Sequence, residues 1–244
     1  MRLTRVHVDA PLSVGARIVL PEAPANHLAR VLRLQVGDDC VLFNGDGHDY
    51  GARLTCAGKR GVEADIVSMQ ALDNESPLRI VLLQGIARGE KMDLILQKAA
   101  ELGVAAIVPV QAERTEVKLD ATRLAKRIAH WQSVVVSACE QSGRARVPDL
   151  SPPASLTDAA SALSTDALRL TLDPAGERSL ATMAPPDTMH VAIAIGPEGG
   201  WSPRDRTILQ AAGFEGLRLG PRILRTETAG LAAIAALQSR FGDL

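Results

Sequence analysis

Aromatic residues are scarce in this sequence: two Trp, one Tyr and three Phe among 244 residues. The core must therefore be aliphatic, and few aromatic rings are left on which nucleic-acid bases could stack. The formal net charge is −1 at pH 7, so the composition gives no global sign of a nucleic-acid partner. If the protein binds RNA, arginine side chains and phosphate contacts should dominate that binding.

Cysteines and long apolar runs are also few. Cys40, Cys56 and Cys139 are far apart and form no CxxC pair, which disfavours a disulfide framework or a zinc site and is typical of a reducing compartment. No apolar run approaches the length of a membrane span, and the first twenty residues contain four charged residues and no signal-peptide core. We therefore expect a cytoplasmic protein with no membrane partner and no metal.

Several familiar catalytic motifs are missing. The sequence has no GxxxxGKS/T phosphate loop, no GxGxxG after a strand-like run, no GxSxG elbow and no HExxH pair. These absences disfavour a P-loop NTPase, an ordinary dinucleotide-binding enzyme, a serine hydrolase and a zinc protease. The five histidines are scattered, which favours structural or exposed positions for them.

Two glycine-containing stretches near the C-terminal end stand out, IGPEGGWS at residues 195–202 and LGPRILRTETA at residues 219–229. Each follows an apolar, strand-like run and leads into a helix-like one. Glycine lets a backbone approach a ligand closely, and ligands of open α/β sheets bind beyond the carboxyl ends of the strands. Two such loops on neighbouring strands would form one pocket, which suits an adenine edge better than a triphosphate. The apolar residues expected to frame it are Ile195, Leu219, Ile223 and Leu224.

A polar stretch ending in proline, residues 72–77, divides the chain. Before it, short alternating segments surround a strong hairpin signal, Asn-Gly-Asp-Gly at residues 44–47, and one helix is expected over residues 25–32. This pattern predicts a small, compact β-barrel. Its expected strands are residues 17–20, 39–43, 52–55 and 62–67.

After residue 77, strand-like and helix-like segments alternate, which predicts a mostly parallel sheet covered on both faces. Ser202-Pro203 is a good helix start, because serine caps a helix and proline suits its first position. Residues 149–158 are expected to be a connecting stretch. The expected strands are residues 79–84, 104–110, 167–172, 189–195 and 216–219, and the expected helices are residues 91–102, 122–141, 203–212 and 226–240.

The two glycine-containing stretches are similar to the cofactor-binding loops of the SPOUT methyltransferases, which bind S-adenosylmethionine in a C-terminal trefoil knot. With four further stretches, at residues 25–33, 88–93, 97–103 and 138–144, almost the whole chain resembles the RsmE family of 16S ribosomal RNA (uracil-N3) methyltransferases. The resemblance implies an α/β fold: a knotted parallel-sheet SPOUT domain over residues 77–244 and a PUA-like RNA-binding β-barrel over residues 1–73. It also implies a homodimer. Chain physics alone would not have predicted a knot.

The activity implied by the resemblance is S-adenosylmethionine-dependent methylation of N3 of one uridine, uridine 1498, in the 16S ribosomal RNA of the 30S subunit. Two alternatives stay open. One is a SPOUT methyltransferase acting on another RNA, and the other is a non-enzymatic RNA-binding assembly factor, which the two intact loops disfavour. One departure from the family pattern is Asp173, in Leu172-Asp173-Pro174, where the resemblance leads us to expect histidine.

The residues expected to act follow from the loops and the resemblance together. Uridine N3 is a poor nucleophile until its proton leaves, so a base and a cation that stabilises the uracil anion should both help. Catalytic roles are assigned to Arg225, Arg222 and Glu198, with Glu227 as a second nearby carboxylate. A purely structural role, an arginine capping carbonyls or Glu198 pairing with Arg222, is the alternative for these residues.

The remaining assignments are to cofactor and RNA contacts. The cofactor contacts are assigned to Leu172, Ile195, Gly196, Glu198, Gly199, Leu219, Gly220, Ile223, Leu224 and Thr228. The RNA contacts are assigned to Arg2, Arg5, Arg30, Arg33 and Arg144.

Overall fold

A computed structural model describes residues 3–58, 61–117 and 121–244 of the chain. It divides into two compact units. The first comprises Met1–Glu75 together with Cys139–Val147, and the second comprises Ser76–Ala138 together with Pro148–Leu244.

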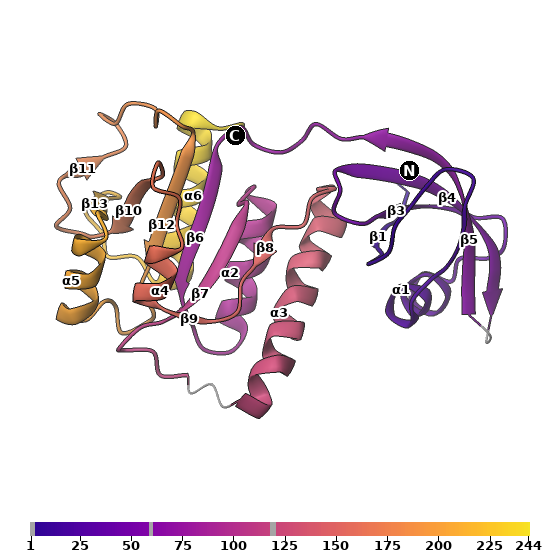
Figure 1. The fold of residues 1–244 in the computed structure, drawn as a ribbon, viewed down its shortest axis with the longest axis horizontal. Coiled ribbons are helices and arrows are strands. Elements are labelled where there is room, and N and C mark those ends of the chain that lie inside the picture. The colour runs from indigo at the N-terminus through magenta and orange to yellow at the C-terminus, as the bar shows by residue number, and fades with distance from the viewer. Residues whose placement is uncertain (1–2, 59–60, 118–120) are drawn as a thin grey trace. The chain divides into compact units, whose positions relative to one another are not determined.

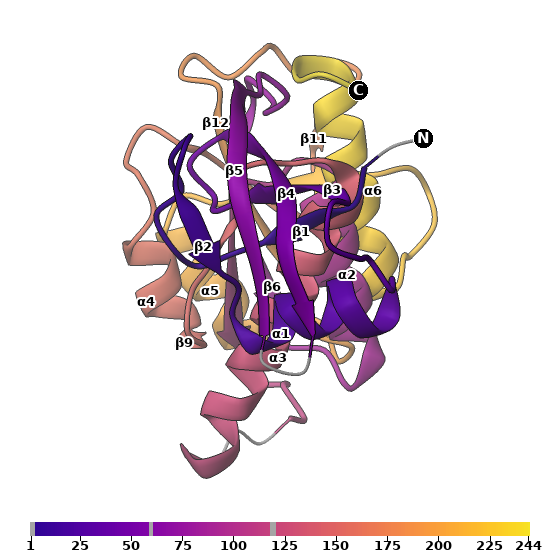
Figure 2. The same ribbon diagram turned by 90° about the vertical axis from the view of Figure 1, so that its right-hand side faces the viewer.

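The first unit is built on one five-stranded sheet with the order β1-β3-β4-β5-β2. The long strands β4 and β5 pair antiparallel and lie side by side in Figure 2, whereas β1 joins β3 in parallel. Two irregularities in the β4–β5 register bend the sheet around an aliphatic core that includes Leu28, Leu42 and Leu54. The strands are β1 (Arg5–His7), β2 (Arg17–Val19), β3 (Asp39–Phe43), β4 (His48–Gly58) and β5 (Gly61–Ala71).

The expected segments of this unit are present with changed lengths. Each expected strand corresponds to a strand, but β4 and β5 extend well beyond residues 52–55 and 62–67. The expected helix over residues 25–32 begins earlier, as α1 (Glu22–Asn26), and continues into a π-helical turn, His27–Val31. Arg33 follows with a φ of 57°, a left-handed conformation that turns the chain away from the helix.

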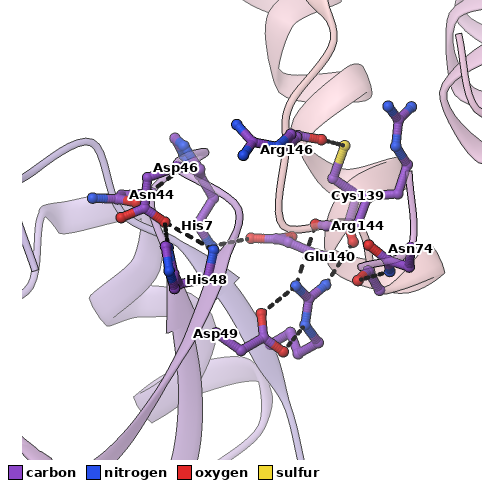
Figure 3. Close-up of polar contacts among 12 residues, drawn as sticks. His7, Asn44, Asp46, His48, Asp49, Asn74, Cys139, Glu140, Arg144 and Arg146 are labelled. Atoms are coloured by element: carbon purple, nitrogen blue, oxygen red, sulfur yellow. Dashed lines mark hydrogen bonds and ion pairs between the residues drawn. The ribbon is translucent and has the colours of Figure 1, made fainter. Parts of the chain in front are cut away.

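The segment Cys139–Val147 belongs to the first unit, although it includes the last residues of helix α3 (Ala121–Ser142). The guanidinium of Arg5 donates to the backbone carbonyl of Cys139 at 2.8 Å and pairs with Asp49 at 2.6 Å (Figure 3). Arg144 pairs with Glu75 in the same unit. The expected boundaries, 1–73 and 77–244, had left this segment in the second domain, because the helical pattern continues through Cys139 with no break in the sequence.

The second unit contains an all-parallel sheet with the order β11-β13-β10-β12-β6-β7-β8, and β9 pairs with β7. The mostly parallel sheet expected from the sequence is therefore confirmed. The strands are β6 (Arg79–Gly85), β7 (Ala106–Gln111), β8 (Asp149–Leu150), β9 (Ala154–Ser155), β10 (Leu168–Leu172), β11 (Arg178–Ser179), β12 (His190–Ile195) and β13 (Glu215–Arg218). Besides α3, the helices are α2 (Glu90–Glu101), α4 (Leu156–Ser161), α5 (Pro203–Ala211) and α6 (Thr226–Phe241).

Helices cover both faces of this sheet, as Figure 1 shows. Leu83 and Ala194 share a core cluster with residues of α4 and α5, including Leu209. The next residue along β12, Ile195, points to the other face, where an added Cβ at Gly230 of α6 would lie 3.4 Å from it. Helix α2 packs beside α6. The central strands thus carry apolar side chains on both faces, which explains their continuous hydrophobic runs.

Candidate active site

The carboxyl ends of three neighbouring strands, β12, β10 and β13, carry the loops that form a pocket of about 460 Å³. This is the edge of an open α/β sheet where ligands bind. The loops at residues 195–202 and 219–229 both contribute to the lining, so the single pocket expected from the sequence is present.

One wall of the pocket is apolar. Ile195 is buried at the end of β12, whereas Ile223, at the tip of the second loop, is 85% exposed. Gly220 has a φ of 71°, and a Cβ at Gly196 would come within 3.2 Å of the Gly200 backbone. The left-handed conformation of Gly220 and the close approach of Gly196 to Gly200 would both be strained by a larger residue. The apolar lining residues include Leu172, Ile195, Leu219, Ile223 and Leu224.

A buried hydrogen-bond chain joins the start of α6 to the first loop. Gln84, fully buried at the end of β6, donates to the Thr226 hydroxyl at 3.1 Å, and Thr226 donates to the Gly196 carbonyl at 2.6 Å. These bonds fix the first loop against α6. Sequence reasoning did not assign Gln84 or Thr226 to the site. The feature that could have indicated Gln84 is a glutamine at the end of an otherwise apolar strand.

Trp201 closes the pocket beside β10. Its indole N–H donates to the Thr171 hydroxyl at 3.0 Å, and that hydroxyl donates to the Ala194 carbonyl at 3.0 Å. Trp201 is 5% exposed and lines the pocket. A buried tryptophan whose N–H has a partner is a rigid wall.

Glu198 holds two loops together. Its carboxylate accepts the Arg88 backbone N–H at 3.1 Å and lies 3.5 Å from Lys91 Nζ. Burial by itself raises the pKa of Glu198, but the hydrogen bond from Arg88, together with its own backbone N–H and Lys91, outweighs burial and leaves the pKa lowered. These bonds give Glu198 an anchoring role between the two loops, and its expected role in catalysis stays a prediction.

Lys91 lies between two carboxylates of the pocket. Its Nζ is 3.5 Å from Glu198 and 4.0 Å from Oε2 of Glu227. That Oε2 atom is buried and has no hydrogen-bond donor within the described residues. A buried acceptor without a donor costs about 1–3 kcal/mol, which a ligand donor would recover.

Arg222 and Arg225 lie on the second loop and line the pocket, and both are exposed. Across the described ranges, no hydrogen bond or ion pair engages either guanidinium group. Arg225 is also the N-cap residue of α6, and it caps that helix without a side-chain bond. The alternative in which these arginines cap carbonyls, or Glu198 pairs with Arg222, therefore finds no support in the structure.

Asp173, the residue at which histidine was expected, also lines the pocket. It pairs with Arg206 of α5 at 2.7 Å, and its other oxygen accepts the Ala175 N–H at 3.0 Å. Asp173 thus forms local structural contacts at this wall, and Leu172 still lines the pocket.

The pocket brings together most of the residues assigned to the site. The assigned residues in its lining are Leu172, Ile195, Gly196, Glu198, Leu219, Gly220, Arg222, Ile223, Leu224 and Arg225. Gly199 and Thr228 are not in the lining: the Gly199 carbonyl accepts a bond from Arg114, and Thr228 is exposed in the first turn of α6. Sequence reasoning did not assign Lys91 or Trp201, although both lie in or beside the stretches that carry the resemblance.

The arginines assigned to RNA contacts differ in exposure. Arg30 and Arg33 are exposed on the first unit. Arg5 and Arg144 are 7% and 5% exposed and pair with acidic residues, so their guanidinium groups hold the first unit together and are not presented to solvent. Arg2 lies outside the described residues.

Neither a metal cluster nor a membrane-spanning helix is found in the described part of the chain. No group of three or more His, Cys, Asp or Glu side chains there could hold a metal ion. No helix there is both long and apolar enough to cross a bilayer.

Comparison with known proteins identifies the family. Residues 74–238 match the RNA methyltransferase domain family, and residues 20–67 match the RNA methyltransferase PUA domain family. The ribosomal RNA small subunit methyltransferase E of Buchnera aphidicola from Schizaphis graminum is 32% identical over 243 residues, covering 100% of this chain and 98% of that protein. The chain belongs to the ribosomal RNA small subunit methyltransferase E family.

Two solved structures are similar over the whole chain. The ribosomal RNA small subunit methyltransferase E of Neisseria gonorrhoeae, bound to S-adenosyl methionine, is 42% identical with a TM-score of 0.92. A Legionella pneumophila protein, solved in complex with the cofactor SAM, is 38% identical with a TM-score of 0.94. Each match covers 100% of both chains. The expected fold class, a SPOUT-type parallel-sheet methyltransferase domain with a PUA-like N-terminal module, is confirmed, and the trefoil knot stays a prediction.

Proposed function

We propose that this methyltransferase transfers a methyl group from S-adenosylmethionine to N3 of one uridine, uridine 1498, of 16S ribosomal RNA. The observation that carries the proposal is the pocket at the carboxyl ends of β10, β12 and β13, in a chain that aligns over its whole length with ribosomal RNA small subunit methyltransferases E. The RNA substrate places the proposed activity in the cytoplasm, on the 30S subunit.

The residues of the pocket fit this cofactor. The apolar wall and the glycine turns at Gly196 and Gly220 suit a purine ring and its polar edge. The carboxylates and arginines of the lining suit the charged ends of an amino acid. When bound, the cofactor supplies a methyl group already activated on a sulfonium, so the protein has to align the acceptor nitrogen and manage its proton.

The side chains divide this work. Gln84 and Thr226 hold the first loop in place, and Glu198 joins that loop to the segment after β6. Arg225 and Arg222 present positive charge at the pocket, where it stabilises the negative charge that develops on the uracil ring. The target base must be unpaired or flipped, because N3 lies on its Watson–Crick edge.

The first unit supplies the RNA contacts in this proposal. Arg30 and Arg33 are exposed on the turn after α1 and can reach phosphates, in a sheet unit that matches an RNA methyltransferase PUA domain. Arg5 and Arg144 are not part of this proposed surface, because their side chains are buried.

The proposed assembly is a homodimer. Most apolar residues of α6 are buried within the chain itself, but Leu231, Ala232, Ala235 and Ala236 are only partly covered. A second copy would cover them. Light scattering should give twice the 25.8 kDa mass of one chain, and a monomer mass at micromolar concentration would contradict the dimer.

The substrate class can be tested by incubating the protein with labelled S-adenosylmethionine and three RNAs: unmodified 30S subunits, free 16S ribosomal RNA and transfer RNA. We expect one methyl group per 30S subunit and none on transfer RNA. Methylation of transfer RNA alone would establish the alternative substrate. Cofactor binding without transfer to any RNA would establish the assembly-factor alternative.

A further inference from the structure

One carboxylate of the pocket differs from the others in its hydrogen bonds. The lining contains three carboxylates. Asp173 is engaged by Arg206, and Glu198 is engaged by the Arg88 N–H and by Lys91. Glu227 alone has a buried oxygen, Oε2, that no donor of the described residues reaches. Glu227 therefore has a hydrogen-bond acceptor in the pocket that the described residues do not use.

The position of Glu227 suits the role of an acceptor. It lies in the first turn of α6, two residues after Arg225, so an acceptor and a cation reach the same pocket from one helix end. The Lys91 ammonium, 4.0 Å from Oε2, is close enough to orient this carboxylate at the pocket. The two carboxylate oxygens interchange by rotation about the terminal torsion, which is soft, so either can face the substrate.

We propose, resting on the proposed function, that Glu227 takes the N3 proton of the target uridine and that Lys91 is its positioning residue. The bond from N3 to the methyl carbon forms as the carbon–sulfur bond breaks. The sulfur keeps the electron pair of that bond and becomes a neutral thioether. The N3 proton passes to the Glu227 carboxylate and from there to solvent.

The test compares the full-length wild-type protein with Glu227→Gln, which keeps the shape of the side chain and removes its ability to take the proton. Glu90→Gln is the matched control, because Glu90 also lies in the first turn of a helix but is exposed and outside the pocket lining. Two quantities are measured: the dissociation constant of S-adenosylmethionine by calorimetry, and the single-turnover rate of 3-methyluridine formation on 30S subunits across a range of pH.

For Glu227→Gln we expect a rate loss of roughly a hundredfold or more at neutral pH, with cofactor affinity within about threefold of wild type. The rate of this variant should rise with pH, because the N3 proton then leaves without help, while Glu90→Gln stays close to wild type. An unchanged rate would overturn the proposal. So would a loss of cofactor affinity equal to the loss of rate, since Glu227 would then be a cofactor contact.

Glu227→Asp keeps the test decisive if the glutamine variant does not fold. Its shorter carboxylate should lower the rate by about tenfold and preserve the wild-type pH profile. A rate that climbs with pH in the aspartate variant would overturn the proposal. The wild-type reaction is measured first: if it forms no 3-methyluridine, the proposed function fails, whereas a fully active Glu227→Gln refutes only the role of Glu227.

Discussion

At the scale of single residues, Arg225 is the side chain whose proposed role can be tested most sharply. It lines the pocket, is exposed, and forms no hydrogen bond or ion pair through its guanidinium with the described residues. If it stabilises the developing uracil anion, Arg225→Ala should lower turnover by roughly a hundredfold, or about 3 kcal/mol, with cofactor affinity and Tm unchanged. Arg225→Lys should recover little, because an ammonium lacks the planar fork of arginine.

The control for this prediction is Arg204→Ala. Arg204 is an exposed arginine of α5 outside the pocket lining, and we expect its loss to leave turnover unchanged. The competing role, an arginine that only holds its loop, predicts that the cofactor affinity and Tm of Arg225→Ala fall together. Kinetics, calorimetry and thermal unfolding on the same two variants separate these outcomes.

The cysteines should differ in reactivity. Burial raises the pKa of the Cys40 and Cys139 thiols to about 11, so both are protonated at pH 7, and both are also shielded from reagents. Cys56 is only partly buried. We expect a colorimetric thiol reagent at pH 7 to modify one thiol in the native protein and three after denaturation. Rapid reaction of all three thiols in the native protein would contradict the packing described for β3 and α3.

At the scale of elements, the contact between the end of β6 and the first loop should be intolerant of substitution. A Cβ added at Gly85 would lie 2.5 Å from the Pro197 backbone nitrogen, so Gly85→Ala must displace the loop. We expect a loss of stability on the order of 1–3 kcal/mol together with weaker S-adenosylmethionine binding. Thermal unfolding and calorimetry measure both quantities.

Gly58→Ala is the matched control for that substitution. Gly58 ends β4, and an added Cβ there would have no described atom within 4 Å. We expect its stability and cofactor affinity to match those of the wild type. If Gly85→Ala binds the cofactor as tightly as Gly58→Ala, the first loop does not shape the cofactor site.

Much of the element order was predictable from the sequence. Periodicity and turn residues predicted the main strands and helices of the second unit, and the Ser202 cap of α5, with its reciprocal bond to Asp205, begins where the Ser-Pro signal indicated. The elements that the sequence did not predict are short. They have two to six residues each and are β1, β8, β9, β11 and α4. Segments of that length are set by their neighbours in the sheet and leave little periodicity to detect.

The positions of the two site loops could be predicted from the sequence, but the hydrogen bonds and ion pairs of the site's side chains could not. Glycine and proline locate the two loops, and the loops bring their apolar residues into one pocket. Sequence reasoning could not show that Arg144 pairs with Glu75, that Glu198 accepts the Arg88 N–H, or that Lys91 lies beside Oε2 of Glu227. Each of these facts depends on partners distant in sequence, which spacing does not reveal.

At the scale of the whole molecule, the cofactor pocket and its lining belong entirely to the second unit. We propose that residues 76–244 fold alone, bind S-adenosylmethionine and fail to methylate RNA. The Tm of this fragment should be lower than that of the full chain. Cys139, Arg144 and Ala145 are buried within the first unit and would become exposed to solvent in the fragment. A fragment that folds but does not bind the cofactor, as judged by calorimetry, would contradict the assignment of the pocket.

The most direct test of the central claim is mass-spectrometric mapping of methylated uridine in 16S ribosomal RNA from cells with and without this protein. The account predicts that one uridine, uridine 1498, carries a methyl group at N3 when the protein is present and none when it is absent, and that the intact gene restores it. The same N3-methylated uridine in cells that lack the protein, or a methyl group that depends on the protein but lies on another atom or another RNA, would contradict it.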